Sequence, residues 1–452
     1  MIPLTLSQLV EVLDAELIGD DAVVKEVSTD TRVIEPDALF VALVGERFDA
    51  HDFVVQAVSS GASALLVSRC VDVKVPQLLV KDTKVALGTL GQFVHQICQT
   101  PTVAITGSCG KTTVKEMVAS IMAQKGRVLY TSGNFNNDIG VPLTLLRSRL
   151  EDDFAVIELG ANHIGEIAYT TQLVNPDVAL VNNVAAAHLE GFGSMEGVKK
   201  AKGEIFQGLK PGAVAIVNLD SQGGELWEGV LSDKTVKTFS LSDNRAQYKA
   251  RNLTMDVNGM ASFTIDTPDT SFDVSLGIIG QHNVANALAA TALSVELGAS
   301  SEMVASGLEA LSKVKGRVES IELSENIKLI DDSYNASVPA MKAAADLLGS
   351  FNGVRWFILG NMAELGEESL ALHRQVGKHA APFKFEYVLT YGADSIAISD
   401  ACHGKHFDTH DSMIEFIRQH IAQHNGSQTI LVKGANSAGM NRIVAAVKEM
   451  YT

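Results

Sequence analysis

The sequence has few cysteines, and they are scattered. Only four occur among 452 residues, Cys70, Cys98, Cys109 and Cys402, and no two of them form a CxxC pair. A zinc site or a disulfide framework needs cysteines at short, regular spacing, so neither organises this chain. The pattern favours a protein of a reducing compartment.

The sequence also lacks an excess of positive charge. Lys and Arg number 36 against 53 Asp and Glu, which gives a formal net charge of -17. Such a chain repels polyanions, so general nucleic-acid binding and docking on an anionic membrane are poor candidates for its function. A bound phosphate group would need local positive groups to hold it.

Long apolar runs and targeting signals are missing as well. No apolar run approaches the length that spans a bilayer. The N-terminal segment MIPLTLSQLVEVLDAEL has no basic region, and its apolar residues have the spacing of a folded helix. No fixed-period repeat or low-complexity tract is present. We expect a soluble, cytoplasmic monomer without stable membrane insertion.

The composition is globular, with 46% hydrophobic and 20% charged residues. Single hydrophobic cores stop growing at roughly 250 to 300 residues, so a chain of this length predicts two or three domains. Pro101, just before the apolar run TVAIT, marks one boundary. A second series of strands and helices begins after Arg317 and marks another.

Apolar strand candidates alternate with helical stretches through most of the chain, with helices predicted at 85–98 and 339–348. The strand candidates after the first boundary lie at 102–106, 153–159, 177–183, 213–219, 328–332, 355–360, 387–392 and 429–434. This order predicts an α/β fold with parallel, doubly wound sheets. The segment 235–276 alternates polar and apolar residues and predicts an antiparallel excursion.

The strongest motif is TGSCGKTT, between a strand candidate and an amphipathic helical stretch. Glycines let backbone N–H groups close around phosphate oxygens, Lys111 supplies a positive charge, and Thr112 offers a hydroxyl to Mg²⁺. Ile105 replaces the first glycine of the usual GxxxxGK[ST] pattern. The context still favours a nucleotide phosphate loop over a simple glycine turn. Its residues are Gly107, Ser108, Cys109, Gly110, Lys111, Thr112 and Thr113.

Four further polar residues have both a functional and a plain interpretation. Glu158 ends a strand at the ligand-bearing edge of the sheet and either binds Mg²⁺ or faces solvent. His188 follows the next strand, and a lone histidine is more often structural than a ligand. Lys202, on an amphipathic helix, has the spacing of a solvated lysine. Asn283 begins an alanine-rich helix and either caps it or contacts an adenine.

Taken together, a series of motifs resembles the Mur ligase family over nearly the whole chain. In order, they are TGSCGKTT (106–113), GNFNNDIGVPLT (133–144), IELGANHIGEI (157–167), NNVAAAHLEGFGS (182–194), AKGEIF (201–206), GQHNVANALAA (280–290), GR (316–317) and DDSYNA (331–336). The segments STDTR (28–32), ALFVALVGERFDAHDF (38–53) and NMAELG (361–366) are similar to those of members that add D-alanyl-D-alanine. The DNPR-type sequence of the diaminopimelate- or lysine-adding members is not found.

The resemblance implies three domains. They are an N-terminal domain over 1–99 for the UDP part of the substrate, a central P-loop parallel-sheet ATPase-like domain over 100–316, and a C-terminal Rossmann-like domain over 317–452 that binds the incoming dipeptide. The implied reaction joins D-alanyl-D-alanine to UDP-N-acetylmuramoyl-tripeptide through an acyl phosphate. ATP and Mg²⁺ are the implied cofactors.

The resemblance also assigns roles to individual residues. Lys111, Glu158, His188 and Lys202 are the implied catalytic residues. The implied metal ligands are Thr112, Glu158, His188 and Lys202, the last as a carbamate that supplies an anionic oxygen. Besides the phosphate loop, the implied nucleotide contacts are Asn283, Arg317 and Asp332. The implied substrate contacts are Thr31, Arg32, Asp49, His51, Asn136 and Asn137.

The chain departs from the family pattern at two places. Asn361 stands where relatives commonly have Asp, and Ala435-Asn436 stands where they commonly have Ser-Arg. How the C-terminal domain holds the dipeptide is therefore open. The alternatives are another Mur or folylpolyglutamate-type ligase and, from a different class, a regulatory P-loop ATPase that hydrolyses ATP slowly without an amine substrate.

Overall fold

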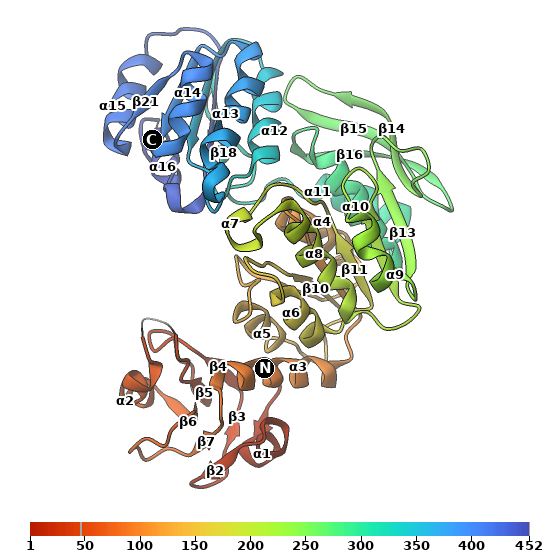
Figure 1. Cartoon of the computed structure of the whole chain (residues 1–452), viewed down its shortest axis with the longest axis vertical. Helices are drawn as coiled ribbons and strands as arrows, with labels where there is room; N and C mark the ends of the chain where they lie inside the picture. Colours follow the sequence, from red (N-terminus) through yellow and green to blue (C-terminus); the bar gives the residue numbers. More distant parts are fainter. Residues whose placement is uncertain (46–47, 452) are drawn as a thin grey trace.

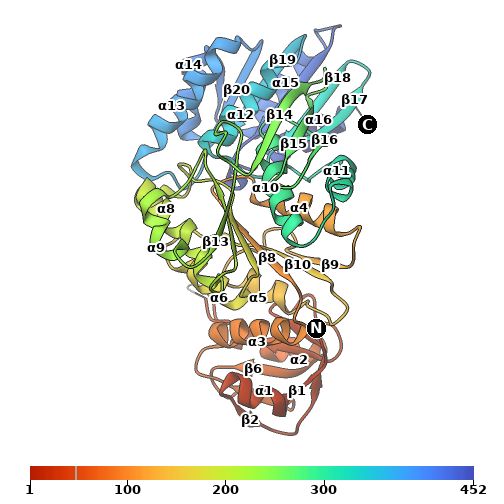
Figure 2. The same ribbon diagram turned by 90° about the vertical axis from the view of Figure 1, so that its right-hand side faces the viewer.

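Three large sheets follow one another along the chain in this computed structural model, which describes residues 1–45 and 48–451. The N-terminal part lies at one end of the long axis and the C-terminal part at the other (Figures 1 and 2). Glu46 and Arg47 of the GERFDAHDF segment lie outside the described residues, as does Thr452. No helix in the described ranges is long and apolar enough to cross a membrane.

The N-terminal part holds a five-stranded sheet and a short two-stranded ladder. The sheet has the order β2 (Glu16–Ile18), β7 (Gln77–Leu79), β6 (Ala62–Val67), β5 (Ala38–Val41) and β4 (Glu26–Ser28), and the ladder pairs β1 (Leu4–Thr5) with β3 (Val23–Val24). Its helices are α1 (Leu6–Leu13), α2 (Val54–Ser59) and α3 (Thr83–Cys98). Thr5 caps α1 in a reciprocal capping box with Gln8, which fixes where that helix begins.

The central part holds a nine-stranded sheet. Its order is β16 (Ser271–Ile279), β15 (Met260–Asp266), β14 (Tyr248–Met255), β13 (Thr235–Ser240), β12 (Val214–Asn218), β11 (Val178–Val181), β8 (Thr102–Thr106), β10 (Phe154–Glu158) and β9 (Val128–Tyr130). The strands from β9 to β14 are parallel, and β14, β15 and β16 are antiparallel. The helices are α4 (Lys111–Met122), α5 (Gly140–Leu145), α6 (Glu166–Val174), α7 (Leu189–Phe192), α8 (Met195–Gly203), α9 (Glu228–Leu231), α10 (Asn283–Glu296) and α11 (Ser301–Ala310).

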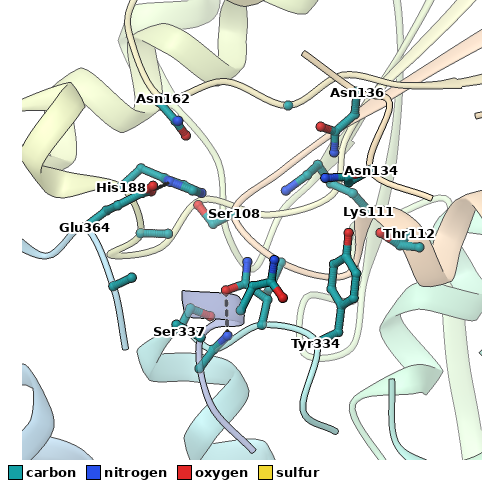
Figure 3. A pocket seen from close by; sticks show the side chains of 18 of the residues that line it. Ser108, Lys111, Thr112, Asn134, Asn136, Asn162, His188, Tyr334, Ser337 and Glu364 are labelled. Carbon is teal, nitrogen blue, oxygen red and sulfur yellow. Dashed lines mark hydrogen bonds and ion pairs between the residues drawn. The ribbon is translucent and has the colours of Figure 1, made fainter. Parts of the chain in front are cut away.

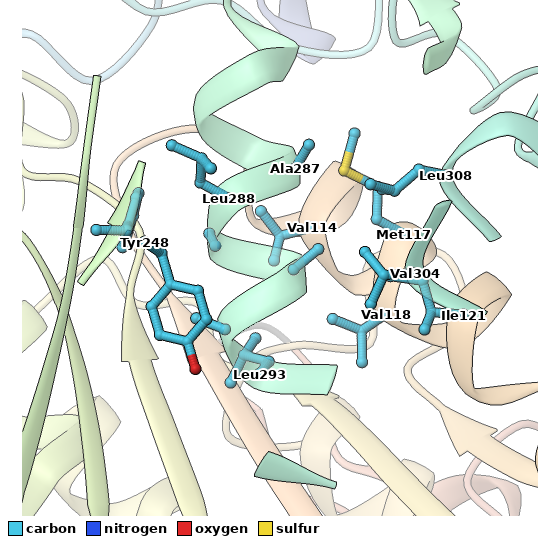
Figure 4. Close-up of a cluster of buried hydrophobic side chains, with 14 of the residues drawn as sticks. Val114, Met117, Val118, Ile121, Tyr248, Ala287, Leu288, Leu293, Val304 and Leu308 are labelled. Atoms are coloured by element: carbon cyan, nitrogen blue, oxygen red, sulfur yellow. The ribbon is translucent and has the colours of Figure 1, made fainter. Parts of the chain in front are cut away.

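Both faces of the central parallel strands are buried. Along β8, Val103 and Ile105 join one hydrophobic cluster, whereas Ala104 joins the cluster on the opposite face. Figure 4 shows the first cluster, where Val114 and Met117 of α4 face side chains of α10 and α11. Burial on both faces explains why these strands have short continuous apolar sequences. It also holds the loop between β8 and α4 on a rigid support.

The C-terminal part holds a six-stranded sheet between two layers of helices. Its order is β17 (Glu319–Ser324), β18 (Ile327–Asp332), β22 (Gln428–Lys433), β19 (Val354–Gly360), β20 (Tyr387–Tyr391) and β21 (Lys405–Phe407), all parallel except the β17–β18 pair. The helices are α12 (Val338–Gly349), α13 (Ser369–Ala380), α14 (Ile396–Cys402), α15 (His410–Ile421) and α16 (Asn441–Glu449). Phe357 and Leu359 pack on one face of the sheet, and Trp356 and Ile358 on the other.

The α/β fold predicted from the sequence is confirmed, with one error in the segment 235–276. Its last three strands, β14 to β16, form the predicted antiparallel excursion. The first, β13, instead pairs in parallel with both β12 and β14. The excursion therefore begins one strand later than predicted.

Candidate active site

The phosphate loop lies between the end of β8 and the start of α4, as predicted. Gly110 has φ +78°, and a Cβ there would overlap the side chains of Asn182 and Asn286. Glycine is required at this position for both reasons. The loop therefore presents backbone to the cavity at the N-terminus of α4, where the helix dipole favours an anion.

Two asparagines at the end of β11 fix the shape of this loop. Asn183 accepts from Ser108 N–H through its carbonyl, at 3.0 Å, and from Cys109 N–H through Oδ1, at 2.9 Å. Asn182 Nδ2 and Asn183 Nδ2 both donate to the carbonyl oxygen of Cys109, each at 3.0 Å. The loop is thus held by neighbouring strands before any ligand binds.

Lys111 is the cation of the loop. Its Nζ donates to the carbonyl oxygen of Gly107 at 2.8 Å, across the mouth of the loop. Burial lowers the pKa of Lys111 below its ordinary value, and nearby Glu158 opposes this shift. This half-buried ammonium group has one backbone hydrogen-bond partner, so it keeps donors for an anion in the loop.

Glu158 is a buried carboxylate whose hydrogen-bond partners are neutral. It is 1% exposed, accepts from Thr112 Oγ1 at 3.0 Å, and accepts from Asn136 Nδ2 at 2.8 Å. A buried charge needs compensation, and carboxylate, hydroxyl and amide oxygens are the donors that Mg²⁺ prefers. Glu158 and Thr112 therefore fit a magnesium ion. The described residues contain no cluster of three or more His, Cys, Asp or Glu placed to bind a metal.

His188 precedes α7 and meets a residue from the C-terminal part of the chain. Its Nδ1 contacts Oε2 of Glu364, and the backbone N–H of Glu190 donates to the carbonyl oxygen of Glu364 at 3.1 Å. Burial and the neighbouring charge of Lys111 lower the pKa of His188 below its ordinary value, while Glu364 opposes the shift. The contact links the central and C-terminal parts directly beside the phosphate loop.

Lys202 is buried on α8, not solvated as its helical spacing suggested. The side chain is among the largest that are fully buried, and Nζ lies over the ring of Phe192, 5.1 Å from its centroid. Burial and the charge of Lys111 lower the pKa of Lys202 to about 7, against opposing effects of Glu204 and Glu166. A large fraction of the amine is therefore neutral at neutral pH.

Arg317 crosses from the C-terminal part toward the phosphate loop. Its Nη2 donates to Thr112 Oγ1 at 3.4 Å, and its guanidinium lies over the ring of Tyr334, 4.4 Å from the centroid. Nε is buried with no partner among the described residues. The guanidinium is thus positioned at the loop with hydrogen-bonding capacity left for a ligand.

Asp332 takes part in a buried ion pair. Its Oδ2 lies 2.7 Å from Lys433 Nζ, the two side chains are 9% and 3% exposed, and Oδ1 accepts from Val318 N–H. Lys433 also donates to the carbonyl oxygen of Asn335. The pair ties β18 to β22 at the carboxyl ends of the strands.

Replacing Lys433 with methionine should destabilise the protein by about 3 kcal/mol or more, because Asp332 would keep a buried charge without its cation. Calorimetric unfolding of the variant against the wild type measures this. Adding Asp332→Asn to Lys433→Met should restore most of the loss. An unchanged melting temperature in the single variant would show that the pair contributes little.

These groups surround a cavity of 470 Å³ between the central and C-terminal parts (Figure 3). Of the predicted site residues, those that line it are Ser108, Cys109, Gly110, Lys111, Thr112, Asn136, Asn137, Glu158, His188 and Arg317. Those outside its lining are Gly107, Thr113, Lys202, Asn283, Asp332, Thr31, Arg32, Asp49 and His51. The structure thus brings the phosphate loop and most of the metal candidates together.

Asn283 and Asn137 have structural partners. Asn283 is 2% exposed, donates through Nδ2 to the carbonyl oxygen of Ile279, and accepts from Asn286. Asn137 Oδ1 accepts from Gly140 N–H at 2.8 Å at the start of α5. The adenine contact of Asn283 stays a prediction.

Four of the predicted substrate contacts, Thr31, Arg32, Asp49 and His51, lie in the N-terminal part of the chain. His51 Nδ1 is 2.6 Å from Asp49 Oδ1, and the hydrogen bond of Arg69 to Asp49 holds the pKa of that carboxyl below its usual range. Arg32 is exposed and paired with Asp30, whereas Thr31 is half-buried. Their substrate roles stay predictions.

Sequence reasoning assigned no role to several residues of the lining. Glu364 lies in the NMAELG segment that marked the resemblance, but its contact with His188 joins positions 176 residues apart. The others with polar side chains are Asn134, Asn162, Glu166, Tyr334, Asn335, Ser337, Asn436 and Ser437. Some of them lie in the motifs GNFNND and DDSYNA, but the sequence does not indicate which side chains of these motifs face the cavity.

Comparison with known proteins covers the whole chain. The Mur ligase middle domain matches residues 105–294, the "Mur ligase, glutamate ligase domain" matches 316–436, and the "Mur ligase family, catalytic domain" matches 23–95. The UDP-N-acetylmuramoyl-tripeptide--D-alanyl-D-alanine ligase of Escherichia coli (strain K12) is 51% identical, with 100% of each chain covered.

Solved structures agree with this match. The crystal structure of MurF from Acinetobacter baumannii has a TM-score of 0.93 and 36% identity, and 99% of each chain is covered. The structure of MurF ligase from Thermotoga maritima in complex with ADP has a TM-score of 0.84 and 25% identity, and covers 94% of this chain and 97% of that one. From its motifs, its fold and its full-length relatives, this chain belongs to the Mur ligase family.

Proposed function

We propose that the chain is an ATP-dependent ligase that joins D-alanyl-D-alanine to UDP-N-acetylmuramoyl-tripeptide, giving the UDP-N-acetylmuramoyl-pentapeptide precursor of peptidoglycan, ADP and phosphate. The observation that carries the proposal is full-length identity of 51% to a ligase named for this reaction. The cavity supports it, because a phosphate loop, a buried carboxylate and an arginine from a second part of the chain converge there.

The first step activates the carboxyl group of the tripeptide. A carboxylate reacts poorly with an amine because its oxygen is a poor leaving group, whereas an acyl phosphate made with the γ-phosphoryl group of ATP reacts readily. Two anions must approach each other for this transfer. Lys111 and Arg317 supply positive charge on two sides of the cavity, where low dielectric strengthens their effect.

The metal ligands are part of the proposal. Thr112 and Glu158 would hold one Mg²⁺, which the contact between their side chains supports. His188 and a carbamate on Lys202 would hold a second, which the low pKa of the buried amine supports. When bound, Mg²⁺ offsets charge on the phosphates and the carboxylate.

The second step is attack of the dipeptide amine on the acyl carbon. A tetrahedral intermediate forms and loses phosphate, the amine loses a proton, and an amide bond results. No covalent bond to the protein is needed. The chain's contribution is to hold both substrates in a site closed by its C-terminal part, and the contacts of Arg317 with Thr112 and of Glu364 with His188 hold that closure.

The domain division at residues 99 and 316 belongs to the same proposal. It is supported by the three large sheets, because none of them contains strands from both sides of either position. We further propose a cytoplasmic monomer, and the four cysteines support the location because all are free thiols. Light scattering of the purified protein would test the monomer.

The test of the proposed function is ATP-dependent phosphate release with UDP-N-acetylmuramoyl-tripeptide, with and without D-alanyl-D-alanine, together with mass spectrometry of the product. Release that requires both substrates, and a product heavier by the dipeptide residue, are expected. Release indifferent to the dipeptide would favour a regulatory ATPase. Activity only with single amino acids or folate-type acceptors would favour another ligase of this fold.

A further inference from the structure

The start of α12 forms part of the cavity wall and carries a polar side chain without a partner. Ser337 is the N-cap residue of this 12-residue helix and lines the cavity (Figure 3). It is 8% exposed, and its hydroxyl has no hydrogen-bond partner in the described part of the chain. A buried hydroxyl without a partner costs free energy, so its position on a cavity wall points to a ligand.

The hydroxyl is free because Ser337 does not cap its own helix. An N-cap serine or threonine normally accepts from the N–H two or three residues later. Ser194, Ser300 and Thr409 do this at the starts of α8, α11 and α15, whereas Ser337 makes no such bond.

Backbone donors lie beside this hydroxyl. The first three N–H positions of a helix have no intrahelical partner, and here the second is Pro339, which has no N–H. The N–H of Met341 donates to Ser337 O at 2.8 Å, which closes the first helical turn. Val338 and Ala340 therefore keep donors at the positive end of the helix dipole, which favours an anion.

Among the described lining residues, the cation nearest this wall is Arg317, whose guanidinium lies over the ring of Tyr334 and whose Nη2 donates to Thr112 of the phosphate loop. The lining residues of the wall itself are Tyr334, Asn335, Ala336, Ser337, Ala340, Ala363, Glu364, Leu365, Ala435, Asn436 and Ser437. None of these eleven residues is Lys or Arg. At Ser337 itself, the groups offered to an anion are neutral donors and the helix end.

We propose that the Ser337 hydroxyl and the start of α12 bind the carboxylate of the incoming dipeptide, which rests on the proposed function. The phosphates of ATP have their own loop at Lys111, which lies on another wall of the cavity (Figure 3). Glu364, on the same wall as Ser337, contacts His188 through Oε2, and its other carboxylate oxygen gives the dipeptide's ammonium group a partner. A zwitterion thus meets donors at one end and an acceptor at the other.

The test is steady-state kinetics of Ser337→Ala in the full-length enzyme. The KM for D-alanyl-D-alanine should rise about tenfold or more, the effect of losing a hydrogen bond to a charged group. The kcat and the KM values for ATP and for UDP-N-acetylmuramoyl-tripeptide should stay within about twofold. The lost contact holds the dipeptide equally in the ground state and the transition state, so its loss raises only the KM for the dipeptide. The melting temperature should stay within about a degree, because no cap hydrogen bond is lost.

Two variants serve as controls. Ser337→Thr keeps the hydroxyl and should restore a low KM for the dipeptide. Ser350→Ala makes the same truncation at the other end of α12, where the hydroxyl donates to Leu347 O, and should leave all KM values unchanged. A melting temperature that falls in Ser337→Ala while the dipeptide KM stays constant would show a structural role and overturn the proposal.

The carboxylate itself is tested with D-alanyl-D-alaninamide, in which an amide replaces the charged group. The wild type should use the amide much less well than the dipeptide, and Ser337→Ala should show a smaller difference between them. If Ser337→Ala raises the KM for ATP and not for the dipeptide, the anion is a phosphate and the proposal fails. A wild type inactive with the dipeptide would overturn the proposed function as well, so the two failures are distinguishable.

Discussion

Replacing Lys111 with alanine is expected to lower kcat by about a thousandfold or more while leaving the protein folded. Lys111 is the cation of the phosphate loop, and its Nζ bridges the loop through the carbonyl oxygen of Gly107. The charge that builds up between γ-phosphate and carboxylate would lose its nearest fixed positive group. Single-turnover measurement of acyl-phosphate or ADP formation isolates this step from product release.

The fold should survive this change because the wild-type ammonium group is itself costly to bury. Burial lowers the pKa of Lys111, so its removal takes a poorly solvated charge out of the folded protein. The melting temperature should stay equal or rise. Lys125→Ala is a matched control, because that side chain donates to the carbonyl oxygens of Leu297 and Gly298 and lies over the ring of Phe154, and its kcat should be normal. Near-normal turnover of Lys111→Ala would contradict the assignment of the loop.

Much of the fold could be predicted because its signals are local. The run TVAIT became β8 residue for residue, and the helix predicted over 85–98 became α3, which begins two residues earlier at Thr83, where Asp82 caps it. The strand β13 was assigned the wrong direction. Its alternation of polar and apolar residues favoured an antiparallel strand, but in the structure exposure falls along the strand, from exposed Thr235 and Val236 to buried Phe239 and Ser240, and does not alternate.

In the candidate site, too, local features could be predicted from the sequence and long-range contacts could not. The phosphate loop was predicted because its residues are contiguous, whereas the contact of His188 with Glu364 joins two parts of the chain that the sequence keeps far apart. Asn283 shows a second limit. Its residue type suits an adenine edge, yet the bond to Ile279 O that already occupies its amide is visible only in the fold. Ser337 shows the reverse: serine is a common N-cap residue, yet the fold leaves the hydroxyl of this one without a partner among the described residues.

Lys202→Ala is expected to lose at least about a hundredfold in kcat, and added short carboxylates should restore part of it. Carbon dioxide reacts with a neutral amine, and burial lowers the pKa of Lys202 to about 7, so the reactive form is well populated at neutral pH. The carbamate would replace a cation with an anionic oxygen that can bind a metal. NMR with ¹³C-labelled bicarbonate should show one carbamate carbon that is missing from the variant. Full activity of the variant in bicarbonate-free buffer would refute this role.

The same lysine makes a prediction for stability that needs no substrate. Between its folded pKa of about 7 and its ordinary value of 10.5, the unfolded chain binds more protons than the folded one, so wild-type stability should rise with pH across this window. In buffer free of carbon dioxide, Lys202→Met should therefore be more stable than the wild type at pH 6 to 7, by a few kcal/mol. The difference should shrink toward pH 10.

Lys199→Met, on the same helix, is the control. It removes a lysine whose Nζ donates to Glu196 nearer the surface, and its stability difference should show no such trend with pH. A pH-independent difference for Lys202→Met would mean that burial does not lower the pKa of Lys202. The amine would then be protonated at neutral pH and could not react with carbon dioxide.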